Sequence, residues 1–161
     1  MKAVKSILLA ILLPALCASY VAGKPNFSGD WKLNAAKSDF GGMPVPTRFE
    51  QKIAHNEPEL KISFTFVGEF GEFTADSVYT TDGKECVNTS TMGQSKSTVS
   101  WEGDALVVVT KMDMQGTEVT MTNRYSLSED GKTLTVQGHF SSPQGEGNSR
   151  IVMEKIPATR H

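Results

Sequence analysis

Residues 60–66 read Leu-Lys-Ile-Ser-Phe-Thr-Phe, so that apolar and polar side chains alternate with a period of two. Successive side chains of a β-strand point to opposite faces of the sheet, and this period therefore predicts a strand with one buried and one solvated face. Two glycines follow, at Gly68 and Gly71. Glycine adopts the positive φ angles of tight turns, and we therefore expect a hairpin after this strand.

The same pattern recurs along most of the chain. Apolar residues alternate over 27–33, 106–114, 119–127 and 134–140, and a last strand is expected around Ile151. Turn signals separate the strands; they are Asn56-Glu57-Pro58, Gly68 to Gly71, Asp82-Gly83, Met92-Gly93, Gly103-Asp104, Gln115-Gly116, Asp130-Gly131 and Pro143 to Gly147. This regular punctuation predicts an all-β antiparallel meander of about 8–10 strands.

Helical periodicity is not sustained in any window of the sequence. A single helical turn is expected at residues 35–39, because Gly41-Gly42, Pro44 and Pro46 follow it and interrupt a helix. The expected fold therefore has no helical lid.

Closure of the sheet decides between two architectures that share this periodicity. An open sheet of hairpins leaves two unpaired edges, and an up-and-down barrel removes them. A two-layer sandwich fits the same pattern, and closure favours the barrel. A barrel of this strand number is wide enough to leave room for a small ligand inside.

Residues 1–23 have the three parts of a secretory signal peptide: lysines near the start, an apolar run at 7–16, and small residues before Gly23. The apolar run is too short to span a membrane. We therefore expect a signal peptide at 1–23, a β-barrel domain at 24–156, a C-terminal tail at 157–161, and a periplasmic or secreted location. Cleavage after Cys17 or Ser19 is an alternative.

Charge and cysteine content narrow the classes of partner. Residues 1–23 contain two lysines and no acids, so that their removal changes the formal net charge from −2 to −4. A mildly acidic protein lacks the basic surface that neutralises phosphates, and nucleic acid is therefore not an expected partner. Cys86 is the one cysteine after residue 23, which excludes an intramolecular disulfide in the mature chain. No integral membrane segment is expected in the mature chain, and we expect a monomer.

The segment 27–34, Phe-Ser-Gly-Asp-Trp-Lys-Leu-Asn, resembles the opening strand of the calycin barrels, which include the lipocalins and the fatty-acid-binding proteins. The resemblance implies that Gly29 lets the strand bend and that Trp31 plugs the narrow end of the barrel. Segments 26–40, 101–109 and 127–134 also resemble exported bacterial lipocalin-like proteins.

Two departures separate the chain from the fatty-acid-binding proteins. Their helix pair has no counterpart between Asn34 and Thr47, where two glycines and two prolines stand. Their final strand carries an Arg-x-Tyr clamp for a carboxylate, and the matching region here reads Arg150-Ile151-Val152. The resemblance therefore implies the barrel and leaves the ligand open.

Candidate ligand contacts are aromatic and methionine side chains in the expected strands: Phe64, Phe66, Tyr79, Trp101, Met112, Met121 and Tyr125. They line a cavity in one interpretation and fill a packed core in the other. Methionine adapts to irregular space, which favours a cavity.

Arg150 is the candidate anchor for an anionic head group, since a guanidinium can donate two parallel hydrogen bonds to a carboxylate. In the alternative, Arg150 stacks on Trp31 as part of the structural plug. Arg124 lies an even number of residues from Glu118 and Thr120, on the polar face of the expected strand, and it is therefore expected to face solvent.

Catalytic and metal chemistry find little support in the sequence. Cys86 is a nucleophile only if a base or a positive field activates it, and no histidine lies near it in the sequence. No two histidines or cysteines have metal-ligand spacing, so that no metal or cofactor is expected.

Three functions follow from these observations. The first is a small-molecule binding protein, a carrier for an apolar or amphipathic ligand inside the barrel. The alternative is a filled barrel that binds another protein through its hairpin loops. A third, a lipocalin-type isomerase, requires an activated Cys86, and we expect no enzyme.

Overall fold

Ten strands follow one another in the computed structural model, which describes residues 23–69 and 71–158. They are β1 (Gly29–Leu33), β2 (Arg48–Asn56), β3 (Glu59–Gly68), β4 (Gly71–Thr80), β5 (Cys86–Ser90), β6 (Gly93–Glu102), β7 (Ala105–Met114), β8 (Thr117–Leu127), β9 (Thr133–Ser142) and β10 (Gly145–Lys155). Each of the turn signals expected from the sequence falls between two consecutive strands or at their ends. The short 3₁₀ helix η1 (Ala35–Lys37) lies where the single helical turn was expected.

All ten strands form one antiparallel sheet in the order β4-β3-β2-β1-β10-β9-β8-β7-β6-β5. Strand β1 joins the two halves of the sheet, because it pairs with β2 on one side and with the last strand, β10, on the other. Trp31 stands opposite Gln51 of β2 and Lys155 of β10. The prediction of an all-β up-and-down barrel is confirmed, and the barrel is nearly closed.

The seam of the barrel lies between β4 and β5, the two ends of the strand order. The side-chain amide of Asn88 bridges this seam. Its Nδ2 donates to the carbonyl oxygen of Val78 at 3.1 Å, and its Oδ1 accepts from the N–H of Val78 at 2.8 Å. A side chain thus takes the place of a strand partner at this point of the wall.

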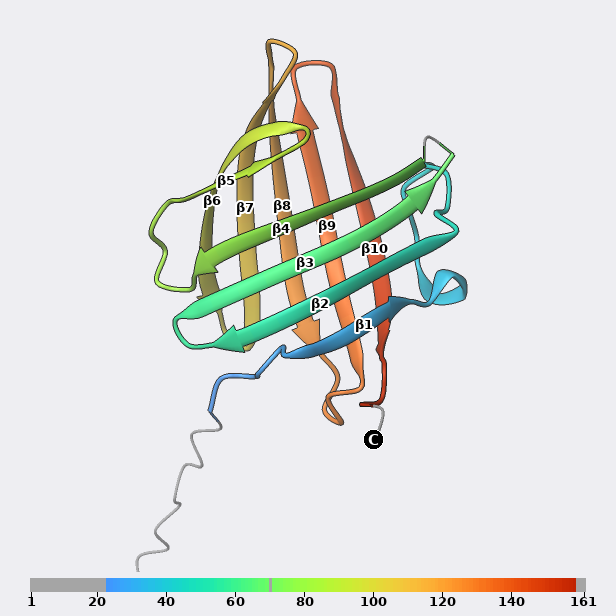
Figure 1. Ribbon diagram of the computed structural model, residues 1–161, viewed down its shortest axis with the longest axis vertical. Helices are drawn as coiled ribbons and strands as arrows, with labels where there is room; N and C mark the ends of the chain where they lie inside the picture. The colour runs from blue at the N-terminus through green and yellow to red at the C-terminus, as the bar shows by residue number, and fades with distance from the viewer. Residues whose placement is uncertain (1–22, 70, 159–161) are drawn as a thin grey trace, which may run out of the picture.

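The barrel is flattened into two layers that enclose the interior. In Figure 1, β2, β3 and β4 run across the front of the molecule, and β7 to β10 run behind them in a different direction. The hairpin turns that join β7 to β8 and β9 to β10 lie together at the top, and β1 lies at the bottom. We call the top, with residues 114–117 and 142–145, the open end, and the bottom, with Trp31, the closed end.

No helix in the described part of the chain is long and apolar enough to span a membrane. No helical lid stands between β1 and β2 in the described residues, which agrees with the expectation from Gly41-Gly42 and the two prolines. The expected signal peptide falls on residues 1–23, of which 1–22 lie outside the described residues.

Candidate functional site

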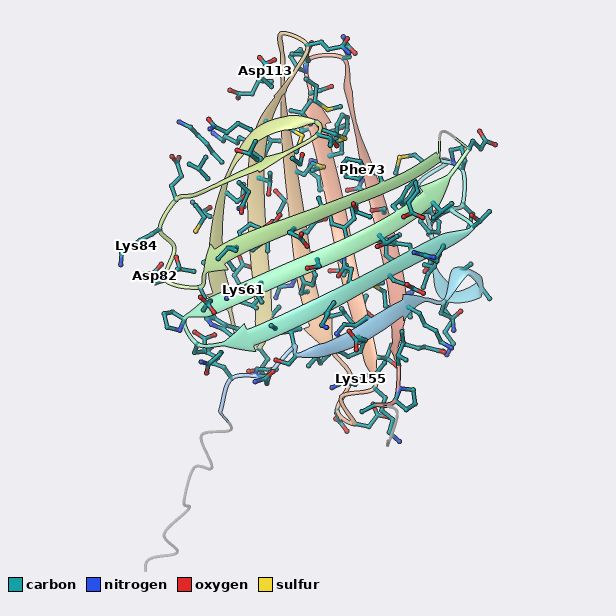
Figure 2. All side chains as sticks on the ribbon, viewed as in Figure 1. Lys61, Phe73, Asp82, Lys84, Asp113 and Lys155 are labelled. Atoms are coloured by element: carbon teal, nitrogen blue, oxygen red, sulfur yellow. The ribbon has the colours of Figure 1, made fainter. Side chains whose placement is uncertain are left out.

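The closed end of the barrel is filled by side chains. Trp31 is fully buried, and its indole N–H donates to the carbonyl oxygen of Phe27 at 3.1 Å. The ammonium of Lys155, labelled in Figure 2, lies 5.2 Å from the centroid of the Trp31 ring, an attractive cation–π arrangement. Gly29 adopts a φ of 149°, and a Cβ there would lie 2.6 Å from Cε of Lys155. Glycine therefore permits both the backbone angle and the approach of the lysine.

A carboxylate at the turn between β2 and β3 ties several segments of the closed end together. Glu57 accepts hydrogen bonds from Trp101 Nε1 at 3.0 Å, from His55 Nε2 at 2.8 Å and from the hydroxyl of Thr81. His55 Nδ1 accepts from the N–H of Phe27 at 3.3 Å, so that the neutral ring carries its proton on Nε2. Desolvation raises the pKa of Glu57, but hydrogen bonds from Thr81, His55 and Trp101 outweigh it and hold the pKa below its usual 4.5.

Between the two layers, toward the open end, lies a cavity of about 250 Å³. Its apolar lining comes from both layers of the barrel: Phe49, Ile62, Phe64, Phe73, Ala75, Val108, Met112, Met121, Val136 and Ile151. Its polar lining includes Gln51, Ser77, Tyr79, Asn88, Ser95, Thr110, Asn123, Tyr125 and Ser149. Apolar atoms provide the larger part of the lining surface, and polar side chains are spread through it, a combination that is typical of a small-molecule binding site.

The polar groups of the cavity differ in how well they are satisfied. The hydroxyls of Ser97, just behind the lining, and Thr110 pair with each other at 2.8 Å. The amide oxygen of Gln51 is buried without any hydrogen-bond partner, the one such side-chain atom among the described residues. Buried polar atoms are almost always paired in folded proteins, so that this oxygen is an unsatisfied acceptor within the wall of the cavity.

Two tyrosines of the cavity lining keep neutral hydroxyls. Burial raises the pKa of Tyr79, and the neighbouring Cys86 adds to the rise against hydrogen bonds with Ser77 and Ser97. Burial also raises the pKa of Tyr125, in the same direction as the nearby Tyr79 and against the lowering influence of the Gln51 amide. Both phenols are therefore protonated in the physiological range.

The open end leads from the cavity to the surface. A hollow of about 520 Å³ shares Met121, Asn123 and Ser149 with the cavity and extends to the loop before β2. Its rim carries Met43 and Phe140, which are 62% and 41% exposed. The interior thus opens to solvent beside apolar side chains at this end.

The structure brings most of the predicted ligand contacts together. Five of them line the cavity: Phe64, Tyr79, Met112, Met121 and Tyr125. Phe66 is not in the lining and packs against Phe49, with ring centroids 6.0 Å apart. Trp101 belongs to the closed end, where its indole binds Glu57.

Arg150 requires a correction. Its side chain is exposed and donates to the carbonyl oxygen of Lys37 at 3.0 Å, on the outside of β10. It therefore does not reach the cavity, and it does not stack on Trp31, whose cation partner is Lys155. The reason is parity, since the inward positions of β10 belong to its neighbours Ser149 and Ile151.

Arg124 lies on the outer face, as expected, and forms an ion pair with Glu102. Phe49 and Gln51 also face the cavity from β2, although neither was among the predicted ligand contacts. Their signal was present, because Phe49, Gln51, Ile53 and His55 alternate with Glu50, Lys52 and Ala54. The polar Gln51 within that inward series marked an unusual position.

Cys86 takes no part in the cavity lining. Its sulfur accepts from the N–H of Thr80 at 3.3 Å and lies 3.6 Å from both the Thr80 hydroxyl and the carbonyl oxygen of Lys84. None of these partners is a base that could activate a thiol. No cluster of three metal-ligating side chains occurs in the part of the chain that the structure describes.

No family model matches the amino-acid sequence, and no curated protein matches it. The fold is similar to that of a secretary abundant heat soluble protein from Ramazzottius varieornatus, with a TM-score of 0.58 and 12% identity over 84% of this chain and 98% of that chain. A zebrafish ileal bile-acid-binding protein complexed with cholic acid gives a TM-score of 0.52 and 18% identity over 81% of this chain and 98% of that one.

The fatty-acid-binding protein of Manduca sexta gives a TM-score of 0.51 at 18% identity, with 80% of this chain and 99% of that chain covered. At such identities the likeness concerns the fold, and a fold by itself does not specify a ligand. The chain therefore shares the barrel fold of these solved structures.

Proposed function

We propose that this protein is an exported carrier that holds a small apolar or amphipathic molecule inside its barrel. The observation that carries the proposal is the cavity of about 250 Å³ between the two layers. Transfer of apolar ligand surface from water into such a space provides affinity, at about 25 cal/mol per Å², and the few polar groups orient the ligand.

The structural neighbours support this proposal at the level of the fold. Two of them are named for bile-acid binding and fatty-acid binding, and each is matched over nearly its whole length. The export part of the proposal rests on the composition of residues 1–23, with its lysines, apolar run and small residues.

Binding is favoured over catalysis by the surroundings of Cys86. The thiol lies at the start of β5, outside the cavity lining, and its hydrogen-bond partners are Thr80 and a backbone carbonyl. An isomerase would need an activated nucleophile facing the substrate. No activated nucleophile of this kind is found among the described residues that line the cavity.

A second candidate function is supported by the surface of the open end. Met92, Met114 and Phe140 are exposed around a hollow of about 770 Å³ between the hairpin turns. Exposed apolar side chains that cluster together mark interaction surfaces, and hairpin loops that bind another protein would use them. The cavity favours the carrier, because a protein-binding barrel has no need of a hollow interior.

A pair of matched substitutions on β4 tests the carrier. Ala75 lines the cavity, and its neighbour Thr74 is exposed on the other face of the strand. Ala75→Trp should fill the cavity and abolish the fluorescence increase of Nile red on binding, whereas Thr74→Trp should leave it unchanged. Native mass spectrometry of protein purified from its own host should find a bound small molecule in the wild type and not in Ala75→Trp.

The carrier fails if the wild-type protein gives a clean apo mass and no response to the probe. It also fails if Ala75→Trp and Thr74→Trp bind the probe equally well, because binding would then take place on the outside of the barrel.

A further inference from the structure

The cavity has a distinctive charge composition. No lysine, arginine or histidine among the described residues lines it, and Asp76 is the one carboxylate at its wall. The arginines of β8 and β10 are engaged outside the cavity. Arg150 binds the carbonyl oxygen of Lys37 and Arg124 pairs with Glu102, both on the outside. An anion that entered the cavity would therefore leave water without meeting a counter-charge.

The polar atom of the cavity wall that lacks a hydrogen-bond partner is an acceptor. Gln51 is 7% exposed and lines the cavity, and its Oε1 lacks a donor. Gln51 stands on β2 opposite Phe64 of β3, a residue of the apolar lining. An unpaired buried acceptor beside an apolar space is satisfied by a ligand that brings a hydrogen-bond donor on a hydrocarbon body.

The neighbouring hydroxyls fit the same chemistry. Tyr79 and Tyr125 line the same cavity as Gln51, and burial raises the pKa of both phenols, so that both keep their protons. Neutral hydroxyls and amides both donate and accept, so that they match another neutral polar group without a desolvated charge. A carboxylate in the same place would be a buried, unpaired ion, which is strongly unfavourable.

We propose that the cavity selects a neutral, hydroxyl-bearing amphipathic ligand, whose O–H donates to Oε1 of Gln51 and whose hydrocarbon part lies against Phe64, Met112 and Met121. This inference rests on the carrier function proposed above and names the chemical class of its ligand. It also distinguishes this barrel from one that holds a fatty-acid carboxylate, since the cavity lacks the arginine that such a ligand requires.

Three model ligands of similar length test the class by isothermal titration calorimetry at pH 7.5. Decan-1-ol carries the donor, its isomer 1-methoxynonane has an ether oxygen and no donor, and decanoate carries a charge. We expect the alcohol to bind about three- to tenfold more tightly than the ether, the range of one hydrogen bond. We expect decanoate to bind at least about tenfold more weakly than the alcohol, because its charge is desolvated without a partner.

A variant of Gln51 assigns the preference to its amide. Gln51→Met keeps the shape of the side chain and removes the acceptor, so that the alcohol and the ether should bind equally. Its thermal midpoint should stay the same or rise, since an unsatisfied buried acceptor is lost. The control is Gln137→Met on the exposed face of β9, which should keep the preference for the alcohol.

The outcomes separate the two proposals. If the ether or decanoate binds the wild type as tightly as the alcohol, the carrier stands and the hydroxyl preference is wrong. An unchanged alcohol-to-ether ratio in Gln51→Met likewise contradicts the role of Gln51. If none of the three compounds binds and Nile red gives no response either, the carrier itself fails.

Discussion

The two ends of the barrel are built from the same strands and differ in how their inward positions are filled. At the closed end, Phe27, Trp31 and Leu134 are almost completely buried, and Trp101 and His55 are tied to one carboxylate. Toward the open end, small side chains take several inward positions, among them Ala75, Ser77, Ser95, Gly138 and Ser149. Side-chain size along each strand therefore decides which half of the interior is solid.

Because of this difference, the closed end should contribute mainly to stability and the open end mainly to ligand binding. The closed end concentrates large apolar side chains and hydrogen bonds between distant segments, so that substitutions there should act on folding. The open end has the cavity and the exposed rim, so that substitutions there should act mainly on binding.

Trp31→Ala should have the largest effect on stability. The side chain is fully buried among residues of the closed end, and its loss leaves a void and an unpaired carbonyl at Phe27. We expect the free energy of unfolding in urea to fall by about 3–5 kcal/mol.

Met121→Ala is the matched substitution at the open end. Met121 lines the cavity and is partly exposed, so that its truncation enlarges an existing space and creates no new one. We expect a loss below about 2 kcal/mol, less than for a tightly packed core methionine. Equal losses in Trp31→Ala and Met121→Ala would contradict the distinction between a solid and a hollow half.

Glu57→Gln should have a smaller and pH-dependent effect. The pKa of Glu57 is lower in the folded protein than its usual 4.5, so that its charge contributes stability above that value, and the contribution is lost as pH falls through the folded pKa. Because the side chain is 46% exposed, solvent screening limits the contribution to about 1 kcal/mol at pH 7.

Urea unfolding of wild type and Glu57→Gln at pH 7 and at pH 3.5 measures this contribution. The difference in the free energy of unfolding should shrink at the lower pH. A difference that stays constant between the two values would show that the charge of Glu57 does not stabilise the closed end.

The sequence predicted the fold well because its signals are local. Alternation with a period of two and a glycine-containing turn after most strands specify hairpins without any knowledge of distant contacts. The expected absence of a helical lid came from glycines and prolines in a single short segment, again a local signal. The pairing of β1 with β10, which makes the barrel nearly closed, is not a local signal. It could be expected only from the argument that a barrel avoids the unpaired edges of an open sheet.

The site was predicted less completely because it depends on the spacing of the two layers. Parity placed Phe64 and Tyr125 on the inside, but it could not tell the hollow half from the solid half, and Trp101 fell in the solid one. The role expected of Arg150 failed because apolar residues occupy both faces of the last strand, with Ile151 and Met153 on one and Val152 on the other, so that alternation does not assign Arg150 to either face. Gln51 was not predicted because a polar residue within an apolar alternation does not by itself show whether it faces a cavity or a packed core.

The central claim is that the barrel is hollow at one end and solid at the other. A crystal structure of the protein under pressurised xenon tests it most directly, because xenon enters dry apolar cavities and not packed side chains. The claim predicts xenon density between Phe64 and Met121 and none around Trp31. Density at neither place, with side chains closing the space between the layers, would contradict it.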